Sequence, residues 1–126
     1  MVARVLTESQ EDYLEAILVL EKKNRVARVS EIATALHVRK SSVTAALKSL
    51  SAHGLAVYTP YAHVVLTGKG ARVARALARN HARLKRFFME RLGIPAKAAD
   101  RNACRMEHAL DPEVMEKLMA AVEQPH

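Results

Sequence analysis

Apolar residues recur at the i, i+3, i+4 spacing of an α-helix in three stretches of the N-terminal half of the chain. Thr7 and Gln10 form a capping-box pattern at the start of the first stretch, and Ser30 is the predicted N-cap of the second. A tight turn separates the second stretch from the third, which ends at Gly54, where a helix C-terminal glycine belongs. The sequence therefore predicts helices over about residues 8–23, 31–36 and 40–53.

The spacing then changes, because two short segments rich in β-forming residues flank a turn that contains Pro60. Thr67 is the predicted N-cap of a long helix that ends at Gly93, and Pro95 and Pro112 suit the first turns of two more helices. The sequence thus predicts two strands, over residues 55–58 and 63–66. It also predicts three helices, over about residues 68–92, 95–110 and 112–122. The predicted fold class is mainly α, with a winged helix-turn-helix DNA-binding domain over residues 1–70 and a helical metal-binding and dimerisation domain over residues 71–126.

The chain is strongly basic, with a formal net charge of +7 over 126 residues and a pI of about 9.9. Such a charge is typical of proteins that meet nucleic acid, although a merely solubilising cationic surface is the alternative. A single cysteine excludes an internal disulfide framework, and no signal peptide or membrane-spanning stretch is apparent. We therefore expect a cytoplasmic protein without membrane attachment.

Three helices followed by a hairpin is the element order of a winged helix-turn-helix, in which the helix after the turn enters the DNA major groove. The corresponding stretch offers cationic side chains for phosphates and short hydroxyl side chains that allow close backbone approach. The alternative is that the serines only cap the helix and the lysines only form a solvated face. The predicted DNA-binding residues are Arg39, Lys40, Ser41, Ser42, Thr44 and Lys48.

Metal-ligand side chains are grouped at helical spacing on three predicted helices. The fifth helix carries a thiol, a carboxylate and an imidazole at i, i+3 and i+4, which lie on one face. The first helix carries two carboxylates at i and i+3, and the fourth carries a histidine within an apolar stripe. Each group has an alternative: surface charge, a hydrogen-bonded core histidine or a small buried hydrophobe. The residues are Cys104, Glu107 and His108, then Asp12 and Glu15, and finally His81.

Several motifs together carry a resemblance to a known family. They are Ser9-Gln10-Glu11-Asp12-Tyr13-Leu14-Glu15-Ala16-Ile17, Arg28-Val29-Ser30-Glu31-Ile32-Ala33, Ser41-Ser42-Val43-Thr44 with Leu47, Gly54-Leu55-Ala56, Leu66-Thr67-Gly68-Lys69-Gly70 and Ala103-Cys104-Arg105-Met106-Glu107-His108-Ala109-Leu110 followed by Glu113-Val114. Over nearly its full length the chain resembles the diphtheria toxin repressor family of metal-dependent regulators, and the run from Ala103 is the most specific part.

The resemblance implies a homodimer, joined through the C-terminal helices, that binds a palindromic operator and represses metal-uptake genes when metal is plentiful. Metal would bridge the first helix to the dimerisation helices and fix two recognition helices about one DNA turn apart. One ion or two per protomer are both compatible with the ligand number. By position the implied ligands are Asp12, His81, Cys104, Glu107 and His108, and Glu15 matches a ligand of the manganese branch.

The candidate site mixes features of two branches of the family. The iron branch has Met where this chain has Asp12, and the manganese branch has Glu where this chain has Cys104. Lys85 replaces a family Glu, and Asp100 replaces an iron-branch His, so that Asp100 either substitutes as a ligand or lies on the surface. Because carboxylates are hard donors that suit manganese, Mn(II) is the predicted activator and Fe(II) the alternative.

Two other functional classes are compatible with parts of the pattern. A winged-helix regulator that does not sense metal would differ in that its DNA affinity would not respond to added or chelated metal. A small metallohydrolase needs an open metal position for substrate, and a site closed by five or six side chains leaves none. We therefore expect a regulator and not an enzyme.

Overall fold

The computed structural model describes residues 6–61 and 63–123, and it divides the chain into two compact units, one formed by Thr7–Arg75 and the other beginning at Ala76. The mainly helical class predicted from the sequence is confirmed. The elements are α1 (Glu8–Asn24), α2 (Val29–Leu36), α3 (Lys40–Ala52), β1 (Ala56–Thr59), β2 (His63–Leu66), α4 (Gly68–Leu92), α5 (Ala96–Ala109) and α6 (Pro112–Val122). No helix among these residues is long and apolar enough to cross a membrane.

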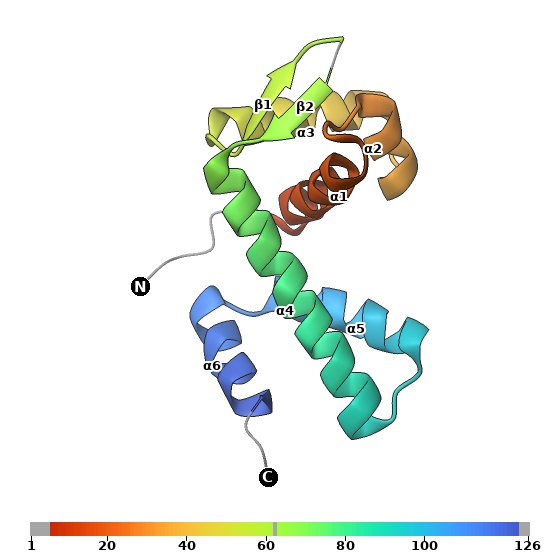
Figure 1. Ribbon diagram of the computed structural model, residues 1–126, viewed down its shortest axis with the longest axis vertical. Helices are drawn as coiled ribbons and strands as arrows, with labels where there is room; N and C mark the ends of the chain where they lie inside the picture. The colour runs from red at the N-terminus through yellow and green to blue at the C-terminus, as the bar shows by residue number, and fades with distance from the viewer. Residues whose placement is uncertain (1–5, 62, 124–126) are drawn as a thin grey trace. The chain divides into compact units, whose positions relative to one another are not determined.

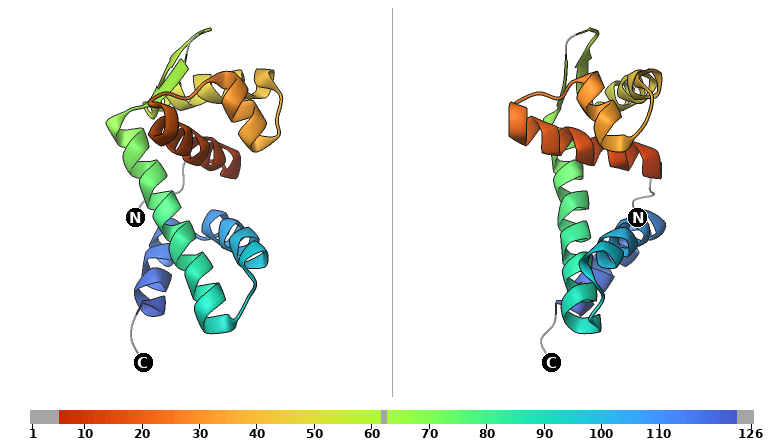
Figure 2. Two further views of the ribbon diagram at one scale, coloured as in Figure 1. Left: turned by 45° about the vertical axis from the view of Figure 1, so that its right-hand side comes forward. Right: turned by 90° about the vertical axis from the view of Figure 1, so that its right-hand side faces the viewer.

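The first unit is a winged helix-turn-helix. Helices α1, α2 and α3 pack around side chains with no exposed surface, and the antiparallel hairpin β1–β2 extends away from them in both views of Figure 2. Each such aliphatic side chain contributes about 1.5–3 kcal/mol by leaving water. The central residues are Leu14, Ile17, Ile32, Val43, Leu47, Leu50 and Val64.

The helix boundaries follow from local hydrogen bonds. The predicted capping box of α1 is confirmed, since Thr7 Oγ1 accepts from the Gln10 amide at 3.1 Å and Gln10 Oε1 accepts from the Thr7 amide at 2.9 Å. The prediction that Ser30 caps α2 is wrong, because the helix already starts at Val29 and the N-cap is Arg28. Glu31 accepts from the Arg28 amide at 3.1 Å and thereby stabilises that earlier start.

One residue outside the hairpin β1–β2, which forms the wing, pairs with it, and the apolar spacing did not predict this pairing. Ala27, in the link between α1 and α2, pairs with Val64 of β2 through reciprocal amide-to-carbonyl hydrogen bonds of 3.1 and 2.9 Å. The amide of Leu66 also donates to the carboxylate of Glu21 on α1 at 3.4 Å. An isolated two-stranded hairpin is only marginally stable, so these contacts to α1 and its linker stabilise the wing.

The start of α4 lies against the turn that precedes the wing. Thr67 Oγ1 accepts from the Gly70 amide at 3.0 Å, as an N-cap does, and donates to the Gly54 carbonyl at 2.7 Å. The approach is so close that a Cβ on Gly70 would lie 1.8 Å from the Leu55 carbonyl oxygen. The predicted cap is confirmed, and Gly70 is required by packing.

The second unit has its own core. Leu84 on α4, Ala103 on α5 and the two methionines Met115 and Met119 on α6 form a buried cluster. Figure 1 shows α5 and α6 beside the C-terminal half of α4. Pro95 is the N-cap of α5 and does not occupy the first helical position as predicted, whereas Pro112 does open α6.

Candidate metal centre and DNA-binding surface

Helix α5 carries three metal-ligand side chains, and two of them are buried. Glu107 is 2% exposed and His108 is 8% exposed, whereas Cys104 is half-buried. The Cys104 Sγ and an imidazole nitrogen of His108 lie within 4.8 Å of each other, as their i, i+4 spacing requires. A thiol, a carboxylate and an imidazole are therefore gathered on one helix face, as the sequence predicted.

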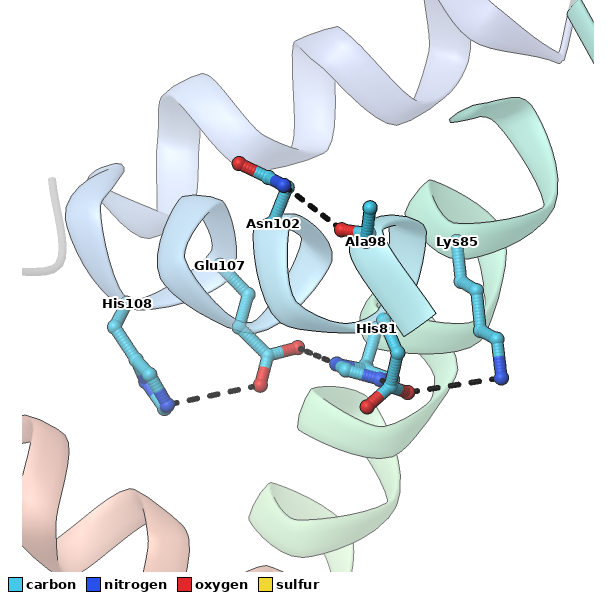
Figure 3. A network of polar contacts seen from close by, with 7 residues as sticks. His81, Lys85, Ala98, Asn102, Glu107 and His108 are labelled. Carbon is cyan, nitrogen blue, oxygen red and sulfur yellow. Dashed lines mark hydrogen bonds and ion pairs between the residues drawn. The ribbon is translucent and has the colours of Figure 1, made fainter. Parts of the chain in front are cut away.

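Helix α4 adds His81 to this group, and Figure 3 shows the Glu107 carboxylate between His81 and His108. The distances are 3.7 Å from His81 Nδ1 to Glu107 Oε2 and 3.8 Å from His108 Nε2 to Glu107 Oε1. Both are too long for hydrogen bonds. A buried carboxylate is costly unless its charge is compensated, and a cation or a protonated imidazole supplies that compensation.

His81 Nδ1 provides a test of whether a metal fits here. This nitrogen is buried and has no hydrogen-bond partner among the described residues. Nitrogen and oxygen ligands lie about 2 Å from a bound transition metal, so two ligands of one ion stand about 3–4 Å apart. The Nδ1–Oε2 separation of 3.7 Å falls in that range, and we conclude that the donor set fits a divalent metal ion.

The other ring nitrogen of His81 has a different partner. His81 Nε2 lies 2.8 Å from Asp100 Oδ1, and Lys85 Nζ lies 3.7 Å from the same oxygen. The hydrogen bond with His81 lowers the pKa of the Asp100 carboxyl, the charges of His81 and Lys85 add to this lowering, and desolvation opposes it. Asp100 is thus an ionised, half-exposed carboxylate at the outer side of His81.

Asp12 and Glu15 lie on α1, in the first unit. Both side chains are half-buried, and both line a groove of about 300 Å³ between α1 and α2. The remaining lining is apolar: Ala16, Val19, Leu20, Ala35 and Leu36. The two carboxylates thus share one face of α1, as their i, i+3 spacing predicts.

Five of the six predicted DNA-binding residues lie at or near the N-terminal end of α3, and Lys48 lies about two turns further along the helix. All except the half-buried Thr44 are exposed. The N-cap is Arg39, so Ser41 and Ser42 lie within the first turn and do not cap the helix. Thr44 Oγ1 donates to the Lys40 carbonyl at 3.1 Å, which leaves its oxygen free to accept. The first turn has no acidic residue, so the positive end of the helix dipole is available to a phosphate.

Sequence reasoning left the role of Asp100 open. The spacing contained a signal, because Asp100 precedes Cys104 by four residues and Glu107 by seven, which places all three on one face of α5. Its partner Lys85 follows His81 by four residues on α4 and therefore shares the face of His81.

Two family models match the chain. One, described as the N-terminal DNA-binding domain of iron-dependent repressors, matches residues 5–64, and the other, their metal-binding and dimerisation domain, matches residues 67–126. Among curated proteins, an HTH-type transcriptional regulator of Methanocaldococcus jannaschii is 38% identical over 120 residues, which are 94% of this chain and 96% of the relative. The regulator MntR of Geobacillus kaustophilus is 35% identical over 112 residues, which are 89% of this chain and 79% of MntR.

Solved structures also match the chain. A manganese-dependent transcriptional repressor in complex with manganese matches with a TM-score of 0.79 and 26% identity, over 92% of this chain and 53% of that one. IdeR of T. acidophilum matches with a TM-score of 0.74 and 27% identity, over 94% of this chain and 55% of IdeR. The chain thus spans about half the length of these two solved proteins.

Proposed function

Because the chain belongs to the iron-dependent, or diphtheria toxin, repressor family, we propose that it is a manganese-activated repressor that binds the operators of metal-uptake genes as a homodimer in the cytoplasm. Members of this family are metal-dependent transcriptional regulators and not enzymes. The observation that carries the proposal is the buried Glu107 carboxylate between two imidazoles, beside a His81 nitrogen without a hydrogen-bond partner among the described residues.

The DNA-binding half of the proposal rests on the exposed start of α3. In a winged helix-turn-helix this end of the recognition helix meets base edges and phosphates in the major groove. The cationic side chains would contact phosphates, and the short hydroxyl side chains would allow the backbone to come close. The proposed contact residues are Arg39, Lys40, Ser41, Ser42, Thr44 and Lys48.

The metal-binding half rests on the donor chemistry. The proposed ligands are Asp12, Glu15, His81, Cys104, Glu107 and His108, of which three are carboxylates. Carboxylates are hard oxygen donors and favour Mn²⁺, and the likeness to MntR and to the manganese-bound repressor points the same way. Cys104 offers two donors: its sulfur is soft and favours iron, zinc or cobalt, whereas its backbone carbonyl is a hard oxygen donor. Binding through the sulfur makes Fe(II) the second candidate.

Regulation would follow from the distribution of these ligands between α1 and the pair α4 and α5. When bound, the metal supplies positive charge that the carboxylates of both units share. We propose that this shared binding holds the DNA-reading unit in one arrangement, so that both recognition helices of the dimer reach successive major grooves. Without that charge the two sets of carboxylates share no cation, and the proposal expects a looser arrangement.

The direct test is DNA binding under anaerobic conditions against Mn²⁺, Fe²⁺ and other divalent ions, followed by a chelator. The proposal expects at least a tenfold gain in affinity with metal and its reversal on chelation. The promoter region of a metal-uptake gene from the source genome is the probe, and a scrambled sequence is the control. A DNA affinity that changes with neither added metal nor added chelator would identify a regulator that does not sense metal.

The choice of manganese over iron has its own test at position 12. A carboxylate suits the high coordination numbers that Mn²⁺ accepts, whereas a thioether does not. Asp12→Met should therefore raise the activation midpoint for Mn²⁺ more than that for Fe²⁺, and Val19→Met on the same helix is the matched control. An unchanged ratio of the two midpoints would mean that Asp12 does not set the selectivity.

A further inference from the structure

The two nitrogens of the His81 imidazole have unlike surroundings. Nε2 lies 2.8 Å from Asp100 Oδ1, within hydrogen-bond distance. Nδ1 faces Glu107 Oε2 at 3.7 Å, is buried and has no hydrogen-bond partner in the described chain. An ionised carboxylate can only accept, so the proton of this hydrogen bond must come from Nε2.

We propose that Asp100 is a positioning residue that fixes His81 in its Nε2–H tautomer and thereby leaves the Nδ1 lone pair directed at the metal site. The metal part rests on the proposed function, whereas the tautomer is a property of the apo protein. Histidine ligands commonly donate their second ring N–H to a carboxylate, which sets the ring orientation and strengthens the ligand. Here Asp100 provides that carboxylate from α5 for a histidine on α4.

Lys85 completes the arrangement on the outer side of His81. Its Nζ lies 3.7 Å from the same Oδ1 that accepts from His81, and Figure 3 shows His81 and Lys85 one turn apart on α4. The ammonium group pairs with the Asp100 carboxylate, which accepts from His81 at the same oxygen. Because Nε2 carries the proton of that hydrogen bond, it offers no lone pair to a metal ion, and metal binding by His81 is restricted to Nδ1.

Lys85 on α4 and Asp100 on α5 carry opposite charges. Together they form an ion pair in contact with His81, which assigns Asp100 a role as neither metal ligand nor simple surface residue.

The tautomer can be measured without metal. The full-length apo protein is labelled with ¹⁵N-histidine, and long-range ¹H–¹⁵N correlation spectra are recorded at mildly alkaline pH, where imidazoles are neutral. The expected result is an Nε2–H signal and an unprotonated Nδ1 for His81. In Asp100→Ala the Nδ1–H form should become populated, because Glu107 is then the nearest carboxylate. A wild-type His81 that carries its proton on Nδ1 would overturn the proposal.

Metal binding separates a positioning role from a ligand role. Isothermal titration with Mn²⁺ should show an unchanged number of ions and about tenfold weaker binding for Asp100→Ala, the low end for second-shell changes because Asp100 is half-exposed. Asp100→Asn retains an acceptor oxygen and should recover most of the affinity. If Asn and Ala variants both lose an ion, Asp100 is a ligand and the proposal is wrong.

The matched control is Asn102→Ala. Asn102 is an exposed polar residue two positions further along α5, and its amide donates to the Ala98 carbonyl at 2.8 Å, away from His81. Its removal should change neither the tautomer nor the affinity, and a loss as large as that of Asp100→Ala would overturn a specific role for Asp100. A wild-type protein that binds no divalent metal refutes the proposed function, while the tautomer measurement still decides the role of Asp100.

Discussion

Replacing Gly70 with alanine tests the account of how α4 is joined to the DNA-binding unit. A Cβ at this position would lie 1.8 Å from the Leu55 carbonyl oxygen and 2.8 Å from its carbonyl carbon, whereas real Cβ contacts stay beyond 3.0 Å. Both atoms belong to the backbone, so no change of rotamer can relieve the overlap. The backbone at the start of α4 or at Leu55 must move by about 1 Å.

The cost of that movement can be estimated from the bonds it disturbs. Overpacking costs about 1–3 kcal/mol. The Leu55 carbonyl also accepts from the Thr67 amide at 3.1 Å, and losing a hydrogen bond costs roughly 1 kcal/mol. Alanine recovers up to about 1 kcal/mol of helix propensity. We expect a net loss of about 1–3 kcal/mol, which is a large part of the roughly 5–15 kcal/mol that stabilises a typical domain.

Gly68→Ala is the matched control, because a Cβ there would meet only the Arg72 side chain at 3.5 Å, an ordinary contact. Thermal unfolding followed by circular dichroism should show Gly70→Ala melting about 5–15 °C below wild type. Gly68→Ala should melt within about 2 °C of wild type. Equal melting temperatures for the two variants would refute the close approach of α4 to Leu55.

Three further predictions concern function and pH. His108→Ala should remain folded but lose metal-activated DNA binding in fluorescence anisotropy, and full activation of this variant would contradict the ligand assignment. Lys40→Ala should reduce the slope of log affinity against log salt by about one, whereas Lys117→Ala, an exposed lysine on α6, should leave it unchanged. The hydrogen bond with His81 lowers the pKa of Asp100 from its usual 3.8, so the unfolded chain takes up this proton first as the pH falls. The resulting stability is present above about pH 4 and lost below it, and urea titrations should show a flatter acid dependence for Asp100→Asn.

The order of elements was predictable because each rests on local rules. Apolar spacing located the helices, Thr7 and Thr67 marked two of their starts, and a change of period located the hairpin. The family assignment made from the motifs is confirmed by the matched domain models. The predicted start of α2 was wrong because serine is a common N-cap residue, so Ser30 was an equally plausible cap. In the structure Glu31 accepts from the Arg28 amide and favours the earlier start.

The structure adds what depends on contacts between distant residues. A single residue such as Ala27 has no period, so its pairing with Val64 could not be predicted. The contact of Asp100 with both His81 and Lys85 joins two helices, and only their packing reveals which faces meet. The metal ligands and DNA-contact residues stay predictions, which the variants above test.

The pairing of Ala27 with Val64 has a consequence for the order of folding. The hairpin itself closes a short loop, but this pair joins residues 37 positions apart, so the entropic cost of its closure is recovered only when α1, α2 and α3 have packed. The wing therefore becomes fully ordered late, together with the helical core. In native-state hydrogen exchange the Ala27 and Val64 amides, which bond each other's carbonyls, should exchange at the rate of global unfolding and not of local fraying.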